Sequence, residues 1–102
     1  MEINGKNYEF KYSLRSMFVW ESITGRPFAI STMMDTYVWC YSCIISNQNN
    51  PELDFNAFID ACDNDPNIIV EFNKFMDAEL KKRNLLDGDK KKVTKKKEKN
   101  SQ

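Results

Sequence analysis

The segment over residues 32–46 constrains the fold more than any other part of the sequence, because it is apolar on almost every side when drawn as a helix. Its polar exceptions, Asp35, Ser42 and Ser46, make only a narrow strip. A helix that is apolar all round must be covered by other parts of the protein. We therefore expect it either at the centre of a small domain or in a subunit interface. Thr32 and Asp35 have the spacing of a capping box, so the helix is predicted to start there.

Two shorter elements are expected before this helix. Asn4-Gly5 stands between β-compatible residues, which predicts a two-residue hairpin turn near the N-terminus. A two-stranded hairpin is marginal alone, so it should lie on the helices. A helix should then begin after Ser13, a suitable N-cap, and end before Gly25, which suits the left-handed position after a last turn.

Two more helices are expected after the central one. Asp54 is a suitable N-cap for a short helix, and Asp65 caps a longer one with Pro66 in its first turn. The longer helix has one apolar stripe, made of Ile68, Ile69, Phe72, Phe75, Met76 and Leu80. Residues 87–102 lack apolar periodicity and should form a disordered lysine-rich tail. The sequence therefore predicts a mainly α domain over residues 1–86, with about four helices and an N-terminal β-hairpin.

Composition narrows the possible functions. The chain has no histidine, so it lacks the commonest general base and the commonest metal ligand. It has three cysteines, an odd number, and its opening lacks an apolar targeting segment, which favours a reduced cytosolic protein. The longest apolar stretch is shorter than the about 20 residues that span a bilayer. We therefore expect no enzyme, no cofactor and no membrane partner.

Cys40 and Cys43 form a C-x-x-C, a spacing that in other settings indicates redox chemistry or half of a zinc site. Reactive pairs lie at a helix N-terminus, where the helix dipole lowers the thiol pKa, but this pair lies in the middle of an apolar helix. Zinc needs four ligands, and only Cys62 remains. Packing is therefore the favoured role of these cysteines.

Glu21 is the carboxylate whose role most needs explaining. In a helix that begins at Leu14, the side chains of Leu14, Met17 and Phe18 share one face, which we expect to face the core, and Glu21 falls in the middle of it. Glu21 could be a general acid or base, a buried acceptor for loop amides after Gly25 or a partner of Arg26 or Arg15, or an interface residue. Because buried charges are normally paired, the structural role is favoured.

Much of the chain resembles the tail assembly chaperones of long-tailed bacteriophages and prophages. The resemblance is carried by INGKNYEFKYSLRSMFVWESITGRPF, by the apolar helix that follows, and by LDFNAFIDACDNDPNIIVEFNKFM. It covers roughly residues 1–80 and is most specific around the turn after the first helix. The turn residues are Glu21, Gly25, Arg26 and Pro27, and Glu21 is expected to hold this turn in place.

The resemblance implies a non-enzymatic assembly factor that works in the host bacterial cytoplasm and is absent from the mature virion. Such proteins coat the tape measure protein, keep it soluble and help to recruit tail tube subunits. A small domain with excess apolar surface suits such binding. We also expect self-association, or association with a partner, through the central helix or through the stripe of Phe72, Phe75 and Met76. Because large aromatic residues dominate typical interfaces, the expected partner-binding residues are Trp20, Phe28, Trp39, Phe72, Phe75 and Met76.

The basic tail supports a different class of function. Residues 1–86 hold eight basic and twelve acidic residues, whereas residues 87–102 hold seven lysines and three acids. Such lysines can neutralise phosphates, so a small phage adaptor or regulator that binds nucleic acid is the alternative. The tail has neither arginine nor aromatic residues for base readout or stacking. Nucleic acid is therefore the less favoured partner.

Overall fold

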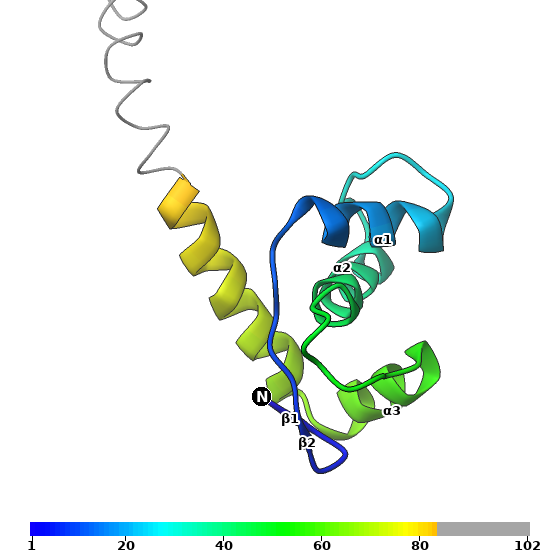
Figure 1. Ribbon diagram of the computed structural model, residues 1–102, viewed down its shortest axis with the longest axis vertical. Helices are drawn as coiled ribbons and strands as arrows, with labels where there is room; N and C mark the ends of the chain where they lie inside the picture. The colour runs from blue at the N-terminus through cyan, green and yellow to red at the C-terminus, as the bar shows by residue number, and fades with distance from the viewer. Residues whose placement is uncertain (84–102) are drawn as a thin grey trace, which may run out of the picture.

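The computed structural model describes residues 1–83, and within them it contains a two-stranded hairpin and four helices (Figure 1). In chain order the elements are β1 (Glu2–Ile3), β2 (Lys6–Asn7), α1 (Leu14–Thr24), α2 (Met33–Ile45), α3 (Phe55–Asn64) and a C-terminal helix (67–83). The predicted mainly α fold with an N-terminal hairpin is confirmed. The disordered tail predicted for residues 87–102 lies outside the described residues.

The hairpin turns at the residues that the sequence indicates. Asn4 and Gly5 have φ angles of 53° and 79°, and a two-residue type I′ turn requires positive φ at both positions. The antiparallel register pairs Ile3 with Lys6. Ile3 is buried in the same apolar cluster as α2, so the hairpin is anchored to the helices.

α2 lies at the centre of the domain, as its apolar sequence predicts. Figure 1 shows it between α1, α3 and the C-terminal helix. Every side chain from Val38 to Ile44 is buried within this one chain. A subunit interface is therefore not needed to cover this part of α2. At the start of the helix Met33 and Met34 are 78% and 68% exposed, and self-association stays a prediction.

An extended segment over residues 8–12 ties the hairpin to the helices (Figure 1). The Lys11 amide donates to the Cys43 carbonyl at 2.9 Å, which joins the segment to α2. The ring of Phe10 meets that of Phe72 edge-on, with centroids 5.2 Å apart, which joins it to the C-terminal helix. The start of the chain thus closes one side of the core.

The helix ends follow the predicted chemistry. Ser13, Thr32 and Asp54 each accept a backbone N–H in the first turn of α1, α2 and α3. Asp65 accepts the amide of Asn67 at 3.0 Å at the start of the C-terminal helix. Each bond satisfies an amide that a helix start leaves without an intrahelical acceptor.

α1 is rotated relative to the orientation expected from the sequence. Leu14 and Phe18, expected in the core, are 67% and 61% exposed, whereas Ser16 and Trp20 are completely buried. Trp20 has the largest apolar surface on the helix, so its burial decides which side faces α2. Ser16 is small enough to allow the two helices to approach. The expected core face of α1 is therefore wrong.

Candidate binding site

Glu21 holds the turn after α1, but from the surface. Its Oε2 accepts the amide of Phe28 at 2.7 Å, which is the predicted bond to the loop beyond Gly25. Gly25 itself adopts a left-handed φ of 69° and ends the helix, and Pro27 follows in an exposed loop. The predicted burial of Glu21 is wrong, because the rotation of α1 that buries Trp20 turns Glu21 outward. The carboxylate therefore stabilises the turn without a desolvation cost.

Asp35 is the buried carboxylate of this region. The residue is 1% exposed, and its Oδ1 accepts a hydrogen bond from Nη2 of Arg26 at 2.6 Å. The other oxygen, Oδ2, accepts from the amides of Ser31 and Thr32 and from the Ser31 hydroxyl, at 3.0–3.1 Å. The Arg26 guanidinium and these donors hold the pKa of Asp35 well below its ordinary value. A pairing of Glu21 with Arg26 is therefore wrong, since Arg26 turns to Asp35.

Three of the expected partner-binding aromatic residues lie together behind this turn. Phe28 contacts Trp20 and Trp39, with ring centroids 5.3 Å and 4.7 Å apart. The Trp20 indole N–H donates to the Asp35 carbonyl at 3.2 Å. Trp20 and Trp39 are buried, and only Phe28 is partly exposed. This cluster therefore holds α1 against α2, and in this conformation it offers a partner little more than the edge of Phe28.

The other expected partner-binding residues lie on the C-terminal helix. Phe72 is 1% exposed, and Phe75 and Met76 are half-buried against the core. Phe10 lies 5.3 Å from Phe75 between ring centroids, so these aromatic residues serve mainly to fix the segment after the hairpin. The structure does not bring them together with the Trp20 cluster as one accessible surface.

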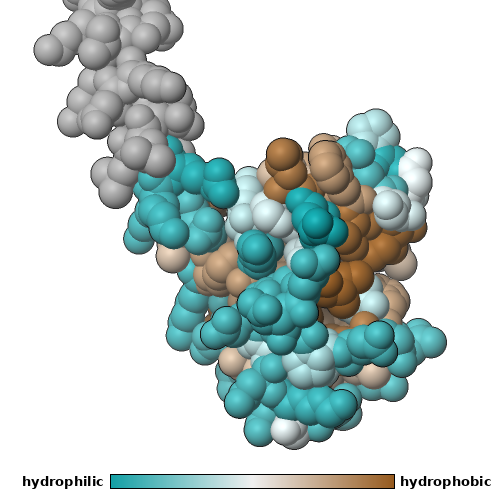
Figure 2. All heavy atoms as spheres, viewed as in Figure 1, coloured by the Kyte–Doolittle hydropathy of each residue, from teal (hydrophilic) through white to brown (hydrophobic). Residues whose placement is uncertain are grey.

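An accessible apolar surface lies instead on the outer side of α1. Figure 2 shows apolar atoms gathered over α1 and the end of α2, while hydrophilic atoms cover the hairpin side. An open groove of about 690 Å³ runs along this surface. It is lined by Leu14, Arg15, Phe18, Val19, Ser22, Ile23 and Ile45. We refer to these seven residues as the α1 groove.

A signal for the α1 groove is present in the sequence. Six of the eleven residues of α1 are apolar, namely Leu14, Met17, Phe18, Val19, Trp20 and Ile23. At about 100° per residue these side chains occupy more than one face of the helix. One neighbouring helix can cover only one face, so some of them had to be exposed. The sequence pattern alone does not show which of these apolar side chains are exposed.

A smaller polar hollow of about 240 Å³ adjoins the start of α1. It shares Arg15 with the α1 groove and is otherwise polar. Its lining residues are Lys11, Ser13, Arg15, Ser46, Asn47, Gln48 and Asn49. We call it the notch. No local sequence pattern marks the notch, because its residues come from two segments, 11–15 and 46–49, that lie far apart in the chain.

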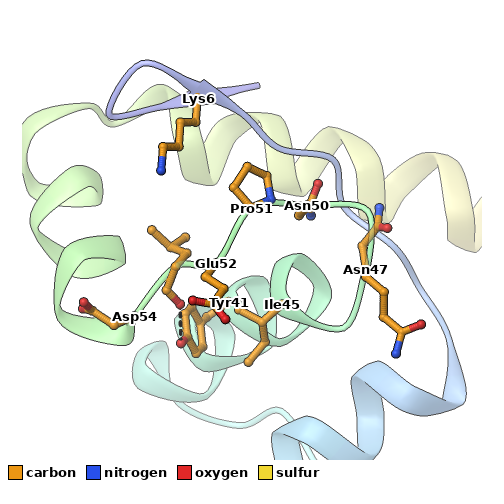
Figure 3. A pocket seen from close by; sticks show the side chains of 10 residues that line it. Lys6, Tyr41, Ile45, Asn47, Asn50, Pro51, Glu52 and Asp54 are labelled. Carbon is orange, nitrogen blue, oxygen red and sulfur yellow. Dashed lines mark hydrogen bonds between the residues drawn. The ribbon is translucent and has the colours of Figure 1, made fainter.

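Another hollow, with a volume of about 780 Å³, lies between the hairpin and the loop after α2 (Figure 3). The Tyr41 hydroxyl at its edge is already used, since it donates to the Leu53 carbonyl at 2.7 Å. Lys6 faces it from the hairpin, and Glu52 and Asp54 line it as well. Charges of both signs and a mixed lining make this hollow a poor match to any one ligand class.

The cysteines lie where packing residues belong. Cys40 and Cys43 are fully buried, and burial raises the pKa of the Cys43 thiol to about 12. Cys62 is half-buried, and desolvation raises its pKa to about 11. Such thiols carry almost no thiolate at neutral pH and are poor nucleophiles. Within residues 1–83, no three His, Cys, Asp or Glu side chains are grouped so that they could hold a metal ion.

None of the helices in the described part of the chain is both long and apolar enough to cross a membrane. No family model, no curated protein and no solved structure matches this sequence. The resemblance to tail assembly chaperones therefore stays a prediction that stands on the residues quoted for it. The strongest structural feature for function is the α1 groove, with the notch beside it.

Proposed function

We propose that this protein is a non-enzymatic tail assembly chaperone of a long-tailed phage or prophage. In this role it binds the tape measure protein in the host cytoplasm, keeps it soluble, helps to recruit tail tube subunits, and is absent from the mature virion. The observation that carries the proposal is the α1 groove, an apolar surface on a helix whose opposite face is already fully used in the core.

The chemistry of the groove suits a helical partner. Leu14 and Phe18 are one turn apart and more than half exposed, and Ile23 continues the surface at 44% exposure. Such a row accepts the apolar stripe of an amphipathic helix, which presents side chains at intervals of three and four residues. A tape measure protein is long and helical, so it would offer many such stripes in succession.

Binding of this kind explains how a small protein could keep a long one soluble. An exposed apolar stripe promotes aggregation while the tape measure protein waits for tail tube subunits. A chaperone that covers the stripe shifts the equilibrium towards the soluble complex by mass action. Transient contacts on an open groove also allow release when the tube subunits assemble.

Co-expression with the tape measure protein from the same genome tests the proposal. Wild-type protein should keep the tape measure protein in the soluble fraction and should be recovered with it. Phe18→Glu should abolish both effects, because it places a charge in the middle of the apolar surface. Val70→Glu is the matched control, since Val70 is 43% exposed on the C-terminal helix and away from the groove residues. An insoluble tape measure protein with wild type would refute the chaperone role.

A second arm of the same experiment concerns the tail. Removal of residues 87–102 should leave solubilisation unchanged, because apolar contact rather than charge is the driving force for binding. If only the full-length chain keeps the tape measure protein soluble, the chaperone role stands but the tail takes part in it.

A further inference from the structure

The hairpin turn carries a chemical feature that binding through the α1 groove does not use. Asn4 is followed by Gly5, and no other asparagine in the sequence precedes a glycine. Both residues are exposed. Asparagine is a thermolabile residue, because its side-chain amide can be lost. This loss is easiest where the next residue has no side chain to shield its backbone nitrogen, which is the case at Asn4.

The structure leaves the Gly5 backbone nitrogen unprotected. Ile3 and Lys6 are paired across the two-residue turn, and the amide between its central residues is not part of this pairing. Within residues 1–83, no backbone carbonyl accepts a hydrogen bond from Gly5. Apart from its chain neighbours, no atom lies within 4 Å of the place where a Gly5 Cβ would be. The nitrogen is therefore free to attack the side chain of Asn4.

The turn also has the freedom to reach the reacting geometry. The Asn4 φ of 53° is a left-handed value that asparagine adopts more readily than most residues other than glycine. Each strand has only two residues, so the turn can open briefly without unfolding the helices. The nitrogen and the side chain belong to adjacent residues, and groups held so close react at a high effective concentration.

We propose that Asn4 deamidates spontaneously in the folded protein, and that one of the two products loosens the hairpin from the helices. The Gly5 nitrogen attacks Cγ of Asn4 and forms a succinimide ring. The bond from Cγ to the side-chain nitrogen breaks, and ammonia leaves with the proton from Gly5. Water then opens the ring, so the net reaction exchanges an amide for a carboxylate and needs neither an oxidant nor a reductant.

Water opens the ring at either of its two carbonyl carbons, and the two products affect the fold differently. Cleavage at Cγ gives aspartate with a normal main chain, and Asp-Gly suits the same turn as Asn-Gly. Cleavage at the main-chain carbonyl gives isoaspartate, in which the main chain passes through Cβ and is one atom longer. A turn of changed length no longer fixes the strand register.

The register matters because the residues beside the turn are anchored in the core. Ile3 and Tyr8 are each 2% exposed, one on each side of the turn. The Tyr8 amide donates to the Met1 carbonyl at 2.7 Å, and the Tyr8 hydroxyl donates to the Glu52 carbonyl at 3.3 Å. Isoaspartate at position 4 should therefore displace at least one of these anchors. This effect is independent of the partner that the protein binds.

Incubation of the full-length protein at pH 8 without denaturant, with samples taken over two weeks, tests the reaction. Trypsin cuts after Lys6 and Lys11, so Asn4 and Asn7 fall in separate peptides, residues 1–6 and 7–11. Deamidation raises the mass of a peptide by one unit, and a sample digested at the start sets the baseline. The peptide with Asn4 should gain this mass and should contain isoaspartate, which protein isoaspartyl methyltransferase labels.

Asn7 is the matched control within the same digest. It is exposed like Asn4, but the amide of the next residue, Tyr8, is held by the Met1 carbonyl. The peptide with Asn4 should change at least about tenfold faster, because the need to break one hydrogen bond can slow a reaction by about that factor. A parallel incubation in urea gives the rate in the unfolded chain, and Asn4 should react at a comparable rate in both conditions.

Thermal unfolding of the modified fraction tests the loosening. Anion exchange separates this fraction from unmodified protein, because each product adds one negative charge. The fraction should melt several degrees below wild type. Asn4→Asp is the control for the added charge, since it has a normal main chain, and it should melt close to wild type. Melting below that of Asn4→Asp is therefore due to isoaspartate.

The outcomes decide the two halves of the proposal separately. If the peptide with Asn4 changes only in urea, or no faster than the peptide with Asn7, the native turn protects Asn4 and the proposed reaction is wrong. If the modified fraction melts together with Asn4→Asp, the hairpin tolerates isoaspartate and the proposed loosening is wrong. Fast modification of Asn4 together with a less stable modified fraction supports both halves.

Discussion

α1 and α2 are both apolar on more than one side, yet the chain covers α2 from Val38 to Ile44 and leaves the outer side of α1 exposed. Only the start of α2, at Met33 and Met34, is exposed to a similar degree. α2 lies between α1, α3 and the C-terminal helix, and its side chains from Val38 to Ile44 are all buried (Figure 1). α1 lies at the edge of the domain with one face against α2. Leu14 and Phe18 on its other face are more than half exposed.

The difference shows that apolar content and burial are separate properties of a helix. A stretch of apolar residues establishes that surface needs covering, but the position of the helix among its neighbours decides how much the chain itself covers. Where the chain leaves a contiguous apolar surface uncovered, as on the outer side of α1, that surface indicates a binding partner. Substitutions on α1, on α2 and in the loop between them test this difference.

The largest effect is expected on the inner side of α1. Trp20→Ala should lower the free energy of unfolding by about 3–5 kcal/mol, because it leaves a large cavity between α1 and α2. Phe18→Ala, two residues away on the outer side, should change it by less than about 0.5 kcal/mol. Urea unfolding followed by circular dichroism measures both. Equal losses for the two variants would show that the outer side of α1 is also part of the folding core.

The fold could be predicted largely because its signals are local. The Asn4-Gly5 turn and the caps at Ser13, Thr32 and Asp54 depend on neighbouring residues, and all were found where expected. The apolar sequence of α2 predicts that the helix is covered, but it leaves open whether the chain itself or another subunit covers it. The rotation of α1 could not be predicted in the same way, since it depends on how Trp20 fits against a helix that lies later in the chain.

The candidate site was harder to predict for the same reason. The expected binding residues Trp20 and Trp39 are large aromatic residues, but size favours burial as much as it favours binding. The Glu21 bond to the loop was anticipated, whereas the pairing of Arg26 with Asp35 was not. The short Asp35 at the capping-box position, where glutamate is preferred, was the available signal. The notch joins segments far apart in sequence, and no local pattern marks it.

The next largest effect concerns the loop that joins α1 to α2. The pKa of Asp35 is lower in the folded than in the unfolded state, so its charged form stabilises the fold at neutral pH. This stability is present above the unfolded pKa of about 4 and is lost as the pH falls towards the folded value. Asp35→Asn should therefore be less stable than wild type at pH 7, and the difference should shrink at pH 3.

Urea midpoints from pH 7 to pH 3 measure this dependence. Asp60→Asn is the control, because Asp60 is exposed and lies outside the loop. Its unfolding should follow the wild-type curve. A constant difference between wild type and Asp35→Asn across the range would mean that the Asp35 charge does not stabilise the loop.

A smaller effect is expected within α2. Cys43→Ala removes one sulfur from the buried part of α2 and should cost about 1 kcal/mol. The raised pKa of Cys43 also predicts that this thiol resists a disulfide reagent at pH 8 in the native wild-type protein, while urea-unfolded protein reacts at once. Cys62→Ala, at a half-buried position, should cost less. Rapid reaction of Cys43 in the native state would show that α2 is less well covered than the structure indicates.

The smallest effect is expected at Glu21, which tests whether a polar residue on the outer side of α1 supports the fold. Its bond to the Phe28 amide is exposed, so Glu21→Ala should cost only about 0.5 kcal/mol, because water can replace the lost acceptor. Glu21→Gln keeps a carbonyl oxygen at the same position along the side chain and should recover part of that loss.

Phe18→Ala on the same face of α1 is the control, since the Phe18 side chain makes no hydrogen bond to the loop. Thermal unfolding at matched pH measures all three. If Glu21→Ala unfolds at the same temperature as Phe18→Ala, the turn is held by Arg26 and Asp35 without help from α1. If Gln restores nothing, the charge of Glu21 rather than its hydrogen bond is what holds the loop.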